Sequence, residues 1–178
     1  MAITGWPLTL EQFLALPEAE PALEYGPDGQ VSQKMSPESR HSRLQKWFVV
    51  RITNYAEPRH LGEALPELRV NTGRASLVPD VAFYREGRVP PMGYPTTAPA
   101  VAIEIASPGQ SRDELAEKCG WYVEQGSSVA LLVDPEERSI SAFSTGQQQT
   151  LRGADLLPVD TVLPGLELRV DDVFSALA

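Results

Sequence analysis

The sequence predicts a single α/β domain in which a central mixed β-sheet is flanked by helices. Its 178 residues are enough for one domain with a hydrophobic core, and 42% hydrophobic and 22% charged residues are typical of a globular protein. Short apolar runs with strand character alternate with segments whose apolar residues recur at helical spacing. No internal repeat or low-complexity linker divides the chain, so we expect residues 1–178 to form one domain.

Capping residues mark where the expected helices begin and end. Thr9 with Gln12, and Ser111 with Glu114, have the three-residue spacing of helix-start capping pairs. Gly126 is placed to stop the second of these helices. The helices expected are a short one from Thr9 to Leu16, a long one over Ser39–Ala56, one from Ser111 to Gln125 and a short one from Asp171.

Runs of β-branched and aromatic residues between turn signals predict the strands. The strands expected are Leu23–Tyr25, Gln30–Met35, Glu63–Val70, Leu77–Tyr84, Ala100–Ala106, Val129–Val133, Ser139–Phe143 and Leu166–Val170. The Pro- and Gly-rich segment Gly87–Pro99 is the expected mobile loop.

The charge of the chain does not favour tight binding of nucleic acid. The net charge is −9, whereas contacts to phosphates draw on Lys and Arg. The excess is mostly C-terminal, because residues 113–178 hold 12 acidic and 4 basic side chains, and residues 1–112 hold 12 and 11. A basic stripe on the N-terminal part is therefore still possible.

The cysteine and hydropathy patterns indicate a cytoplasmic protein. Cys119 is the only cysteine, so no internal disulfide can form, and two histidines offer no credible zinc cage. Met1 to Leu16 lacks the basic leader of a signal peptide, and no apolar run reaches the roughly 20 residues that span a bilayer.

Two carboxylates stand in strand-like apolar surroundings. Glu104 interrupts the run Val101–Ala106, where an uncompensated charge would cost several kcal/mol, of order 3–5. It either pairs with an Arg or faces a solvated edge, or a bound cation keeps it ionised. Asp80 follows Pro79 and precedes β-branched and aromatic residues, which favours a strand over a simple Pro-Asp turn.

Lys118 lies on the helical stripe that should face the sheet. Leu115, Lys118, Cys119 and Tyr122 recur at i, i+3, i+4 and i+7. The lysine can extend to solvent along its alkyl chain, or its ammonium can reach the carboxylates, and the spacing allows both. Two carboxylates with an inward lysine suit Mg²⁺ or Mn²⁺ and phosphodiester chemistry, because hard oxygen ligands hold such ions beside a substrate phosphate.

The order of these motifs resembles the Uma-two family, bacterial domains described as restriction endonucleases. The resemblance covers almost the whole chain and includes His41, which matches the histidine that begins the family's long helix. The segments that carry it most specifically are Pro79-Asp80, Ile103 to Pro108, Glu117-Lys118 with Tyr122, and Leu132 to Pro135.

The resemblance implies a restriction-endonuclease-like fold and the PD-(D/E)XK nuclease superfamily. It implies that Asp80 and Glu104 ligate the metal, with Glu24 and Ile105 as further ligand positions. The alternative for Glu24 is an exposed hairpin residue beside Gly26. The superfamily's lysine two residues after the Glu is missing, because Ala106 stands there. In the family resembled here, a lysine on the next helix takes that role, and Lys118 matches it.

The expected function is metal-dependent hydrolysis of DNA, with Asp80, Glu104 and Lys118 as catalytic residues. The alternative is a binding or assembly module that keeps the fold without turnover; a third possibility is RNA or another phosphorylated ligand. We expect a homodimer, since restriction-type folds often pair. His41 has no partner at nucleophile–base spacing and is expected on the helix surface, with a position lining the cleft as the alternative.

Overall fold

A six-stranded mixed sheet forms the centre of the computed structural model, which describes residues 8–178. The strand order is β10-β9-β8-β7-β6-β3; β7 and β8 run parallel and every other neighbouring pair is antiparallel. These strands are β3 (Gly62–Pro66), β6 (Val81–Arg85), β7 (Val101–Ile105), β8 (Val129–Asp134), β9 (Ser139–Ser144) and β10 (Gln147–Arg152). The mixed sheet of the predicted fold class is confirmed.

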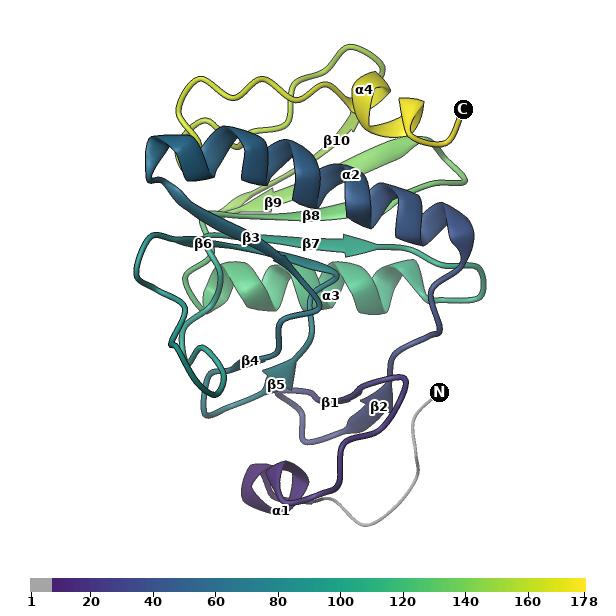
Figure 1. Ribbon diagram of the computed structural model, residues 1–178. Helices are drawn as coiled ribbons and strands as arrows, with labels where there is room; N and C mark the ends of the chain where they lie inside the picture. The colour runs from purple at the N-terminus through teal and green to yellow at the C-terminus, as the bar shows by residue number, and fades with distance from the viewer. Residues whose placement is uncertain (1–7) are drawn as a thin grey trace.

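Two long helices cover opposite faces of this sheet (Figure 1). Helix α2 (Ser39–Ala56) buries Leu44, Phe48 and Ile52 against one face, together with the short C-terminal helix α4 (Val170–Ser175). Helix α3 (Arg112–Glu124) packs on the other face. Because β7 and β8 are covered on both sides, their residues form nearly continuous apolar runs.

A smaller four-stranded sheet lies below the main one in Figure 1. Its order is β2-β1-β5-β4, and α1 packs beside it through Phe13, whose ring lies 5.6 Å from that of Tyr25. Its elements are α1 (Leu10–Leu14), β1 (Leu23–Tyr25), β2 (Val31–Gln33), β4 (Val70–Asn71) and β5 (Ser76–Leu77). The β1–β2 hairpin of this sheet lies next to the end of the main sheet that carries Asp80 and Glu104.

Three strand predictions differ from the structure, and one strand was not predicted. The expected strand Glu63–Val70 is divided into β3 and β4, since Glu67 adopts a left-handed backbone with φ of 50°. Leu77–Tyr84 is divided at Pro79, which cannot donate to a ladder. Leu166–Val170 is not a strand: it makes one isolated bridge, Leu156 to Arg169. Strand β10 was not predicted, because its exposed glutamines lack strand character.

The helix predictions are confirmed to within a few residues. Thr9 and Gln12 form the expected capping box, and Ser111 Oγ accepts from the backbone N–H of Glu114. No helix in residues 8–178 is long and apolar enough to cross a bilayer. Met1 to Pro7, part of the segment assessed as a leader, lie outside the described residues.

Candidate active site

Asp80 is fixed where strand β6 begins. The ladder between β6 and β7 starts at Val81 opposite Ile103, and continuing it would bring Pro79 opposite Ile105. Asp80 replaces the missing ladder bond, because its Oδ2 accepts from the backbone N–H of Ile105 at 2.7 Å. Its carboxylate is thereby held beside the strand that carries Glu104, and its side chain is 3% exposed.

Glu104 lies in the centre of β7 and turns toward helix α3. Its Oε1 accepts from the hydroxyl of Tyr122 at 3.1 Å and lies 3.0 Å from Lys118 Nζ. Tyr122 and Lys118 are one helical turn apart, so a single face of α3 supplies both groups. The alternatives of an arginine partner or a solvated edge for Glu104 are wrong.

Lys118 reaches inward and bridges two glutamates. Its Nζ lies 2.8 Å from Glu24 Oε1 as well as 3.0 Å from Glu104, and its side chain is 13% exposed. Glu24 Oε1 also accepts from the backbone N–H of Val78. The expectation that Lys118 could extend to solvent is therefore wrong, as is that of an exposed Glu24.

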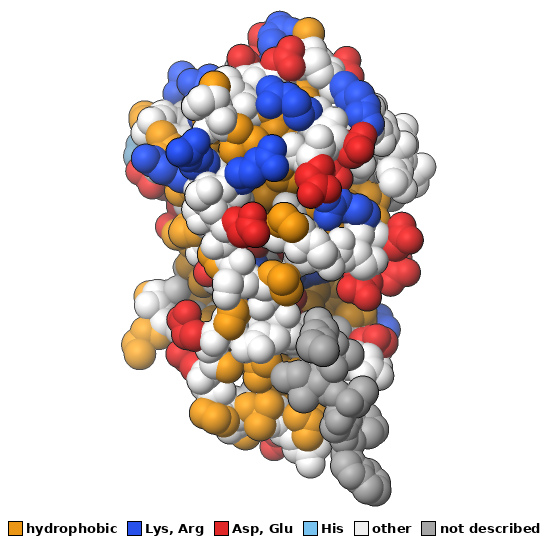
Figure 2. Space-filling model, turned by 90° about the vertical axis from the view of Figure 1, so that its right-hand side faces the viewer, with side chains coloured by type: hydrophobic (Ala, Val, Ile, Leu, Met, Phe, Trp, Pro, Cys, Tyr) orange, Lys and Arg blue, Asp and Glu red, His pale blue; other side chains and the backbone are white. Residues whose placement is uncertain are grey.

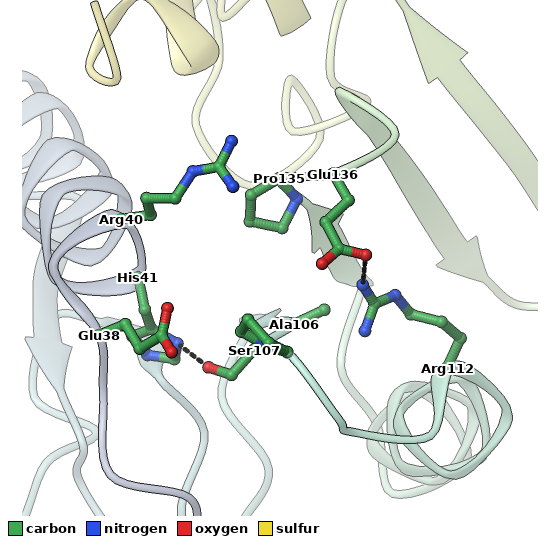
Figure 3. A pocket seen from close by; sticks show the side chains of 9 residues that line it. Glu38, Arg40, His41, Ala106, Ser107, Arg112, Pro135 and Glu136 are labelled. Atoms are coloured by element: carbon green, nitrogen blue, oxygen red, sulfur yellow. Dashed lines mark hydrogen bonds and ion pairs between the residues drawn. The ribbon is translucent and has the colours of Figure 1, made fainter.

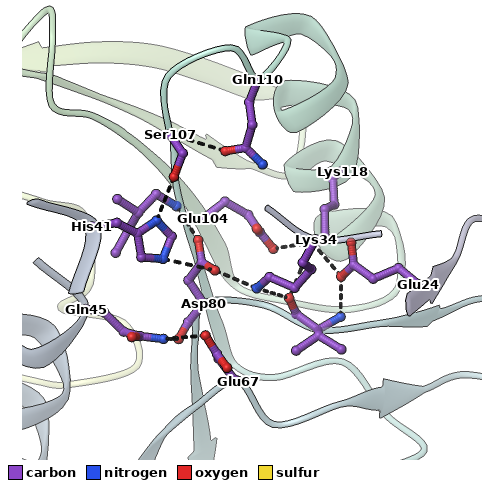
Figure 4. Close-up of polar contacts among 12 residues, drawn as sticks. Glu24, Lys34, His41, Gln45, Glu67, Asp80, Glu104, Ser107, Gln110 and Lys118 are labelled. Atoms are coloured by element: carbon purple, nitrogen blue, oxygen red, sulfur yellow. Dashed lines mark hydrogen bonds and ion pairs between the residues drawn. The ribbon is translucent and has the colours of Figure 1, made fainter. Parts of the chain in front are cut away.

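Lys34 is a second buried cation that the sequence did not single out. Its Nζ lies 2.6 Å from Asp80 Oδ1 and donates to the carbonyl of Val78 at 2.9 Å. Lys118 Nζ approaches the same carbonyl at 3.4 Å. The ammonium groups of Lys34 and Lys118 therefore both approach the Val78 carbonyl oxygen. Lys34 also faces Asp80, whereas Lys118 also faces Glu24 and Glu104 (Figure 4).

His41 also belongs to this cluster, contrary to the prediction that it lies on the helix surface. It is 7% exposed; its Nδ1 lies 3.2 Å from Ser107 Oγ, and its Nε2 lies 3.4 Å from Asp80 Oδ1. Nε2 has no hydrogen-bond partner of good geometry among residues 8–178. One turn later, Gln45 donates to the backbone carbonyl of Asp80 at 2.9 Å. The first turns of α2 thus support the site.

Charge in the cluster is nearly balanced. Three carboxylates, on Glu24, Asp80 and Glu104, face two ammonium groups, on Lys34 and Lys118. Burial alone would raise the pKa of Asp80, but Lys34, His41 and Lys118 hold it well below its usual range. Burial raises the pKa of Glu104 to about 7, although Lys118 opposes this. The raised pKa favours the neutral form of Glu104, which reduces the excess negative charge of the cluster.

Both lysines are charged. Burial disfavours the ammonium form of Lys118, but Glu104, Glu24 and Asp80 outweigh it and hold its pKa well above the usual value. Asp80 has the same effect on Lys34, whose pKa is also raised against its burial. Two buried cations beside three buried carboxylates are a typical mark of a functional site.

The cluster forms the floor of an open cleft of about 610 Å³. The walls are the β1–β2 hairpin and the first turns of α3, and Glu24, Lys34, Asp80, Glu104 and Lys118 all line it. Figure 2 shows a recess at the waist of the molecule on this side. The rim is acidic, since the exposed side chains of Asp28, Glu114 and Glu117 line it too.

The donor groups fit a hard divalent ion bound by two carboxylates. Mg²⁺ is commonly held by one or two carboxylates and keeps several waters, and Asp80 and Glu104 supply such oxygens on the floor of the cleft. Among residues 8–178, no group of three or more His, Cys, Asp or Glu side chains is arranged to hold a metal ion. Ile105 has an apolar side chain, so only its backbone carbonyl could act as a ligand. Ligation by Glu24 and Ile105 stays a prediction.

Sequence reasoning found four of these residues and missed two that complete the cluster. Glu24, Asp80, Glu104 and Lys118 come together from distant segments. Asp80 lies in the bend before β6, as the turn alternative expected, yet its side chain is buried. Lys34 was missed because a lysine at the end of a short polar strand carries no signal of burial.

Comparison with known proteins identifies the family. The model of the Uma2 family, described as "Putative restriction endonuclease", matches residues 10–171. A crystal structure of "a putative nuclease belonging to DUF820" from Anabaena variabilis is 32% identical and superposes with a TM-score of 0.90; the match covers 97% of this chain and 100% of that one. No curated protein matches. The fold is thus that of a structure described as a nuclease, and the chain belongs to the Uma2 family.

Proposed function

We propose that this chain is a divalent-metal-dependent nuclease that hydrolyses phosphodiester bonds of DNA. The supporting observation is that Asp80, Glu104 and Lys118, from three distant segments, meet on the floor of one open cleft. Burying charged groups costs folding free energy, and clusters of such groups are concentrated at functional sites. The descriptions of the family and of the Anabaena variabilis structure point in the same direction.

Asp80 and Glu104 would hold Mg²⁺ or Mn²⁺ through their carboxylate oxygens. When bound, the ion lowers the pKa of a coordinated water and offsets negative charge on the phosphate. The backbone N–H of Ile105 fixes the direction of the Asp80 carboxylate, and the Tyr122 hydroxyl does the same for Glu104. Ligand oxygens held in this way need little rearrangement before they bind an ion.

The two lysines have different parts in this proposal. Lys118 is enclosed by Glu24 and Glu104, so it keeps both glutamates in place and adds positive charge at the floor. Lys34 comes from the hairpin wall beside Asp80 and can contact a phosphate oxygen that enters the cleft. A cation placed where negative charge develops stabilises the transition state.

Cleavage of labelled substrates tests the function. Plasmid DNA and single- and double-stranded oligonucleotides of DNA and of RNA are incubated with Mg²⁺ or Mn²⁺. We expect cleavage of DNA that EDTA stops and that Glu104→Gln abolishes. Glu124→Gln, an exposed carboxylate at the end of α3, is the matched control and should keep full activity. Cleavage that persists in Glu104→Gln would contradict the proposal, and preference for RNA would change its substrate.

A binding or assembly module without turnover is the second candidate, favoured by two observations. The cleft rim is acidic at Asp28, Glu114 and Glu117, and both floor lysines are already paired with carboxylates. Titration of Mn²⁺ into the protein distinguishes the candidates, since only the nuclease requires binding that Asp80→Ala removes. The expected homodimer stays a prediction, which sedimentation of the purified protein would test.

A further inference from the structure

The charged residues of helix α2 are all basic. Its 18 residues, Ser39–Ala56, include Arg40, Arg43, Lys46 and Arg51 and no Asp or Glu, in a chain with 24 acidic and 15 basic residues. All four side chains are exposed. None forms an ion pair with another residue of the described range 8–178. Arg51 lies 5.8 Å from the centroid of the Trp47 ring, so the cations free to meet an anionic partner are Arg40, Arg43 and Lys46.

These residues, which we call the α2 basic surface, lead away from the candidate active site. Arg40, Arg43 and Lys46 follow at three-residue steps, so about 9 Å separates the first from the last along the helix axis. Arg51 lies three helical turns after Arg40, and its side chain leaves the helix axis within about 20° of the same direction. A nucleic-acid strand rises about 3.4 Å per phosphate, so the first three cations span two or three phosphates.

The α2 basic surface is continuous with the cleft through His41 and Ser107. Both residues line the cleft, and both also line a small adjoining pocket together with Arg40 and Arg112. Figure 3 shows the Arg40 guanidinium across the mouth of this pocket from Arg112. Arg112 is already bound to Asp134, at 2.6 Å, and to Glu136. Arg40 is therefore the uncommitted cation next to the site.

The charge of the cleft makes such a surface necessary. The rim is acidic, and Lys34 and Lys118 are paired with carboxylates, so the cleft alone offers little attraction for a polyanion. Figure 2 shows Lys and Arg side chains over the upper half of this face, above the recess, with Asp and Glu side chains among them. Phosphates on either side of the bond to be cut must find their counter-charges outside the cleft.

We propose that the α2 basic surface binds the sugar–phosphate backbone of the nucleic acid whose scissile bond lies in the cleft. The inference rests on the proposed nuclease function. It assigns a positioning role to Arg40, Arg43 and Lys46, which contact phosphates and read no bases. Their contribution should be sensitive to salt, because each phosphate contact releases condensed counterions.

Salt-dependent binding tests the inference. Fluorescein-labelled 20-nucleotide DNA, single-stranded and duplex, is titrated with full-length protein carrying Glu104→Gln, with anisotropy measured from 50 to 200 mM salt in EDTA and in Ca²⁺. Adding Arg40→Ala and Arg43→Ala should weaken binding and lower the slope of log K against log salt by about 2. The control carries Arg85→Ala and Arg88→Ala, two exposed arginines at and just after the opposite end of β6, with the same change in net charge.

The outcomes separate the inference from the proposed function. A lower slope only in the Arg40 and Arg43 variant, with unchanged thermal unfolding, supports the inference. Equal slopes in both double variants overturn it, while cleavage by the wild-type protein would still support the nuclease. Binding to vesicles containing phosphatidylserine through Arg40 and Arg43, without binding to DNA, also overturns it in favour of a lipid surface. If the wild-type protein neither binds nor cuts DNA, both proposals fail.

Discussion

Asp80 Oδ2 accepts a hydrogen bond from the backbone N–H of Ile105, 2.7 Å away, at the point where Pro79 ends the pairing of β6 with β7. One carboxylate oxygen thus extends the β6–β7 ladder by one hydrogen bond, while the other lies 2.6 Å from the Lys34 ammonium. Ile105, the residue after Glu104, thus holds the Asp80 carboxylate beside Glu104. The same hydrogen bond therefore satisfies a buried N–H and positions a carboxylate of the candidate metal site.

Two substitutions of Asp80 should separate its two roles. Asp80→Asn keeps an oxygen that can accept from Ile105, whereas Asp80→Ala leaves that buried N–H without a partner. Both should weaken Mn²⁺ binding at least tenfold, measured by calorimetry. Asp80→Ala should lose about 1–3 kcal/mol more unfolding free energy than Asp80→Asn, the cost of an unsatisfied buried donor. Asp113→Asn, an exposed carboxylate on α3, is the control. Equal stability of the two Asp80 variants would contradict the capping role.

Lys118 should be the more important of the two lysines for stability. Lys118→Met leaves Glu24 and Glu104 without their shared cation, and breaking a buried ion pair in this way costs about 3–5 kcal/mol. Lys34→Met removes a cation that pairs with only one carboxylate, Asp80, and should cost less. Urea unfolding of both variants measures the difference.

A double variant provides the control for Lys118. Adding Glu24→Gln to Lys118→Met removes one of the two carboxylates left unpaired, so part of the lost stability should return. The coupling free energy from the cycle should reach about 1 kcal/mol or more, as for contacting residues. Additive losses would show that Lys118 and Glu24 do not interact in solution.

The candidate site was predictable where burial leaves a pattern in the sequence. Glu104 interrupts an apolar strand, and Lys118 lies on a helix stripe with Leu115, Cys119 and Tyr122, all buried in the structure. Both patterns signal a charged group that must meet a partner inside. Which partner it meets depends on the packing of distant segments, and the sequence therefore left the alternatives open.

Lys34 and His41 could not be found in the same way. Lys34 follows a three-residue strand of intermediate burial, which has no apolar periodicity to mark an inward side. His41 stands in a helix turn next to Arg40 and Arg43, so its surroundings in the sequence are those of a surface residue. Its contacts with Asp80, just before β6, and with Ser107, just after β7, are made in the buried interior.

The stability contributed by Asp134 should depend on pH. Its Oδ2 accepts from Arg112 Nε at 2.6 Å and its Oδ1 from the backbone N–H groups of Glu136 and Glu137. Burial opposes ionisation, but these contacts hold the pKa of Asp134 below its usual value of 3.8. A lowered carboxyl pKa stabilises the fold above pH 3.8, and this contribution is lost as the pH falls through the folded-state value.

Asp134→Asn should therefore be less stable than the wild type at pH 7 and equally stable in acid. The expected difference at pH 7 is about 1 kcal/mol, since the pair is partly exposed. Urea unfolding between pH 7 and pH 2, a range that extends well below pH 3.8, measures it, with Asp113→Asn as the exposed control. A difference that is constant over this range would mean that the Asn change acts through packing and not through charge.

Gly62 should tolerate no side chain at the edge of the main sheet. Its φ is +140°, and a Cβ there would lie 1.9 Å from the carbonyl oxygen of Tyr84 on the paired strand β6. The backbone oxygen cannot move without breaking the β3–β6 pairing, so Gly62→Ala should cost about 3 kcal/mol or more in unfolding free energy. Gly73→Ala is the matched control, because φ is +80° but no atom lies within 4 Å, and it should cost only about 1–2 kcal/mol.

Since β6 begins at the residue after Asp80, a loosened β6 should also weaken Mn²⁺ binding in Gly62→Ala and leave it unchanged in Gly73→Ala. Equal losses of stability in the two variants would show that the contact with Tyr84 does not restrict the strand.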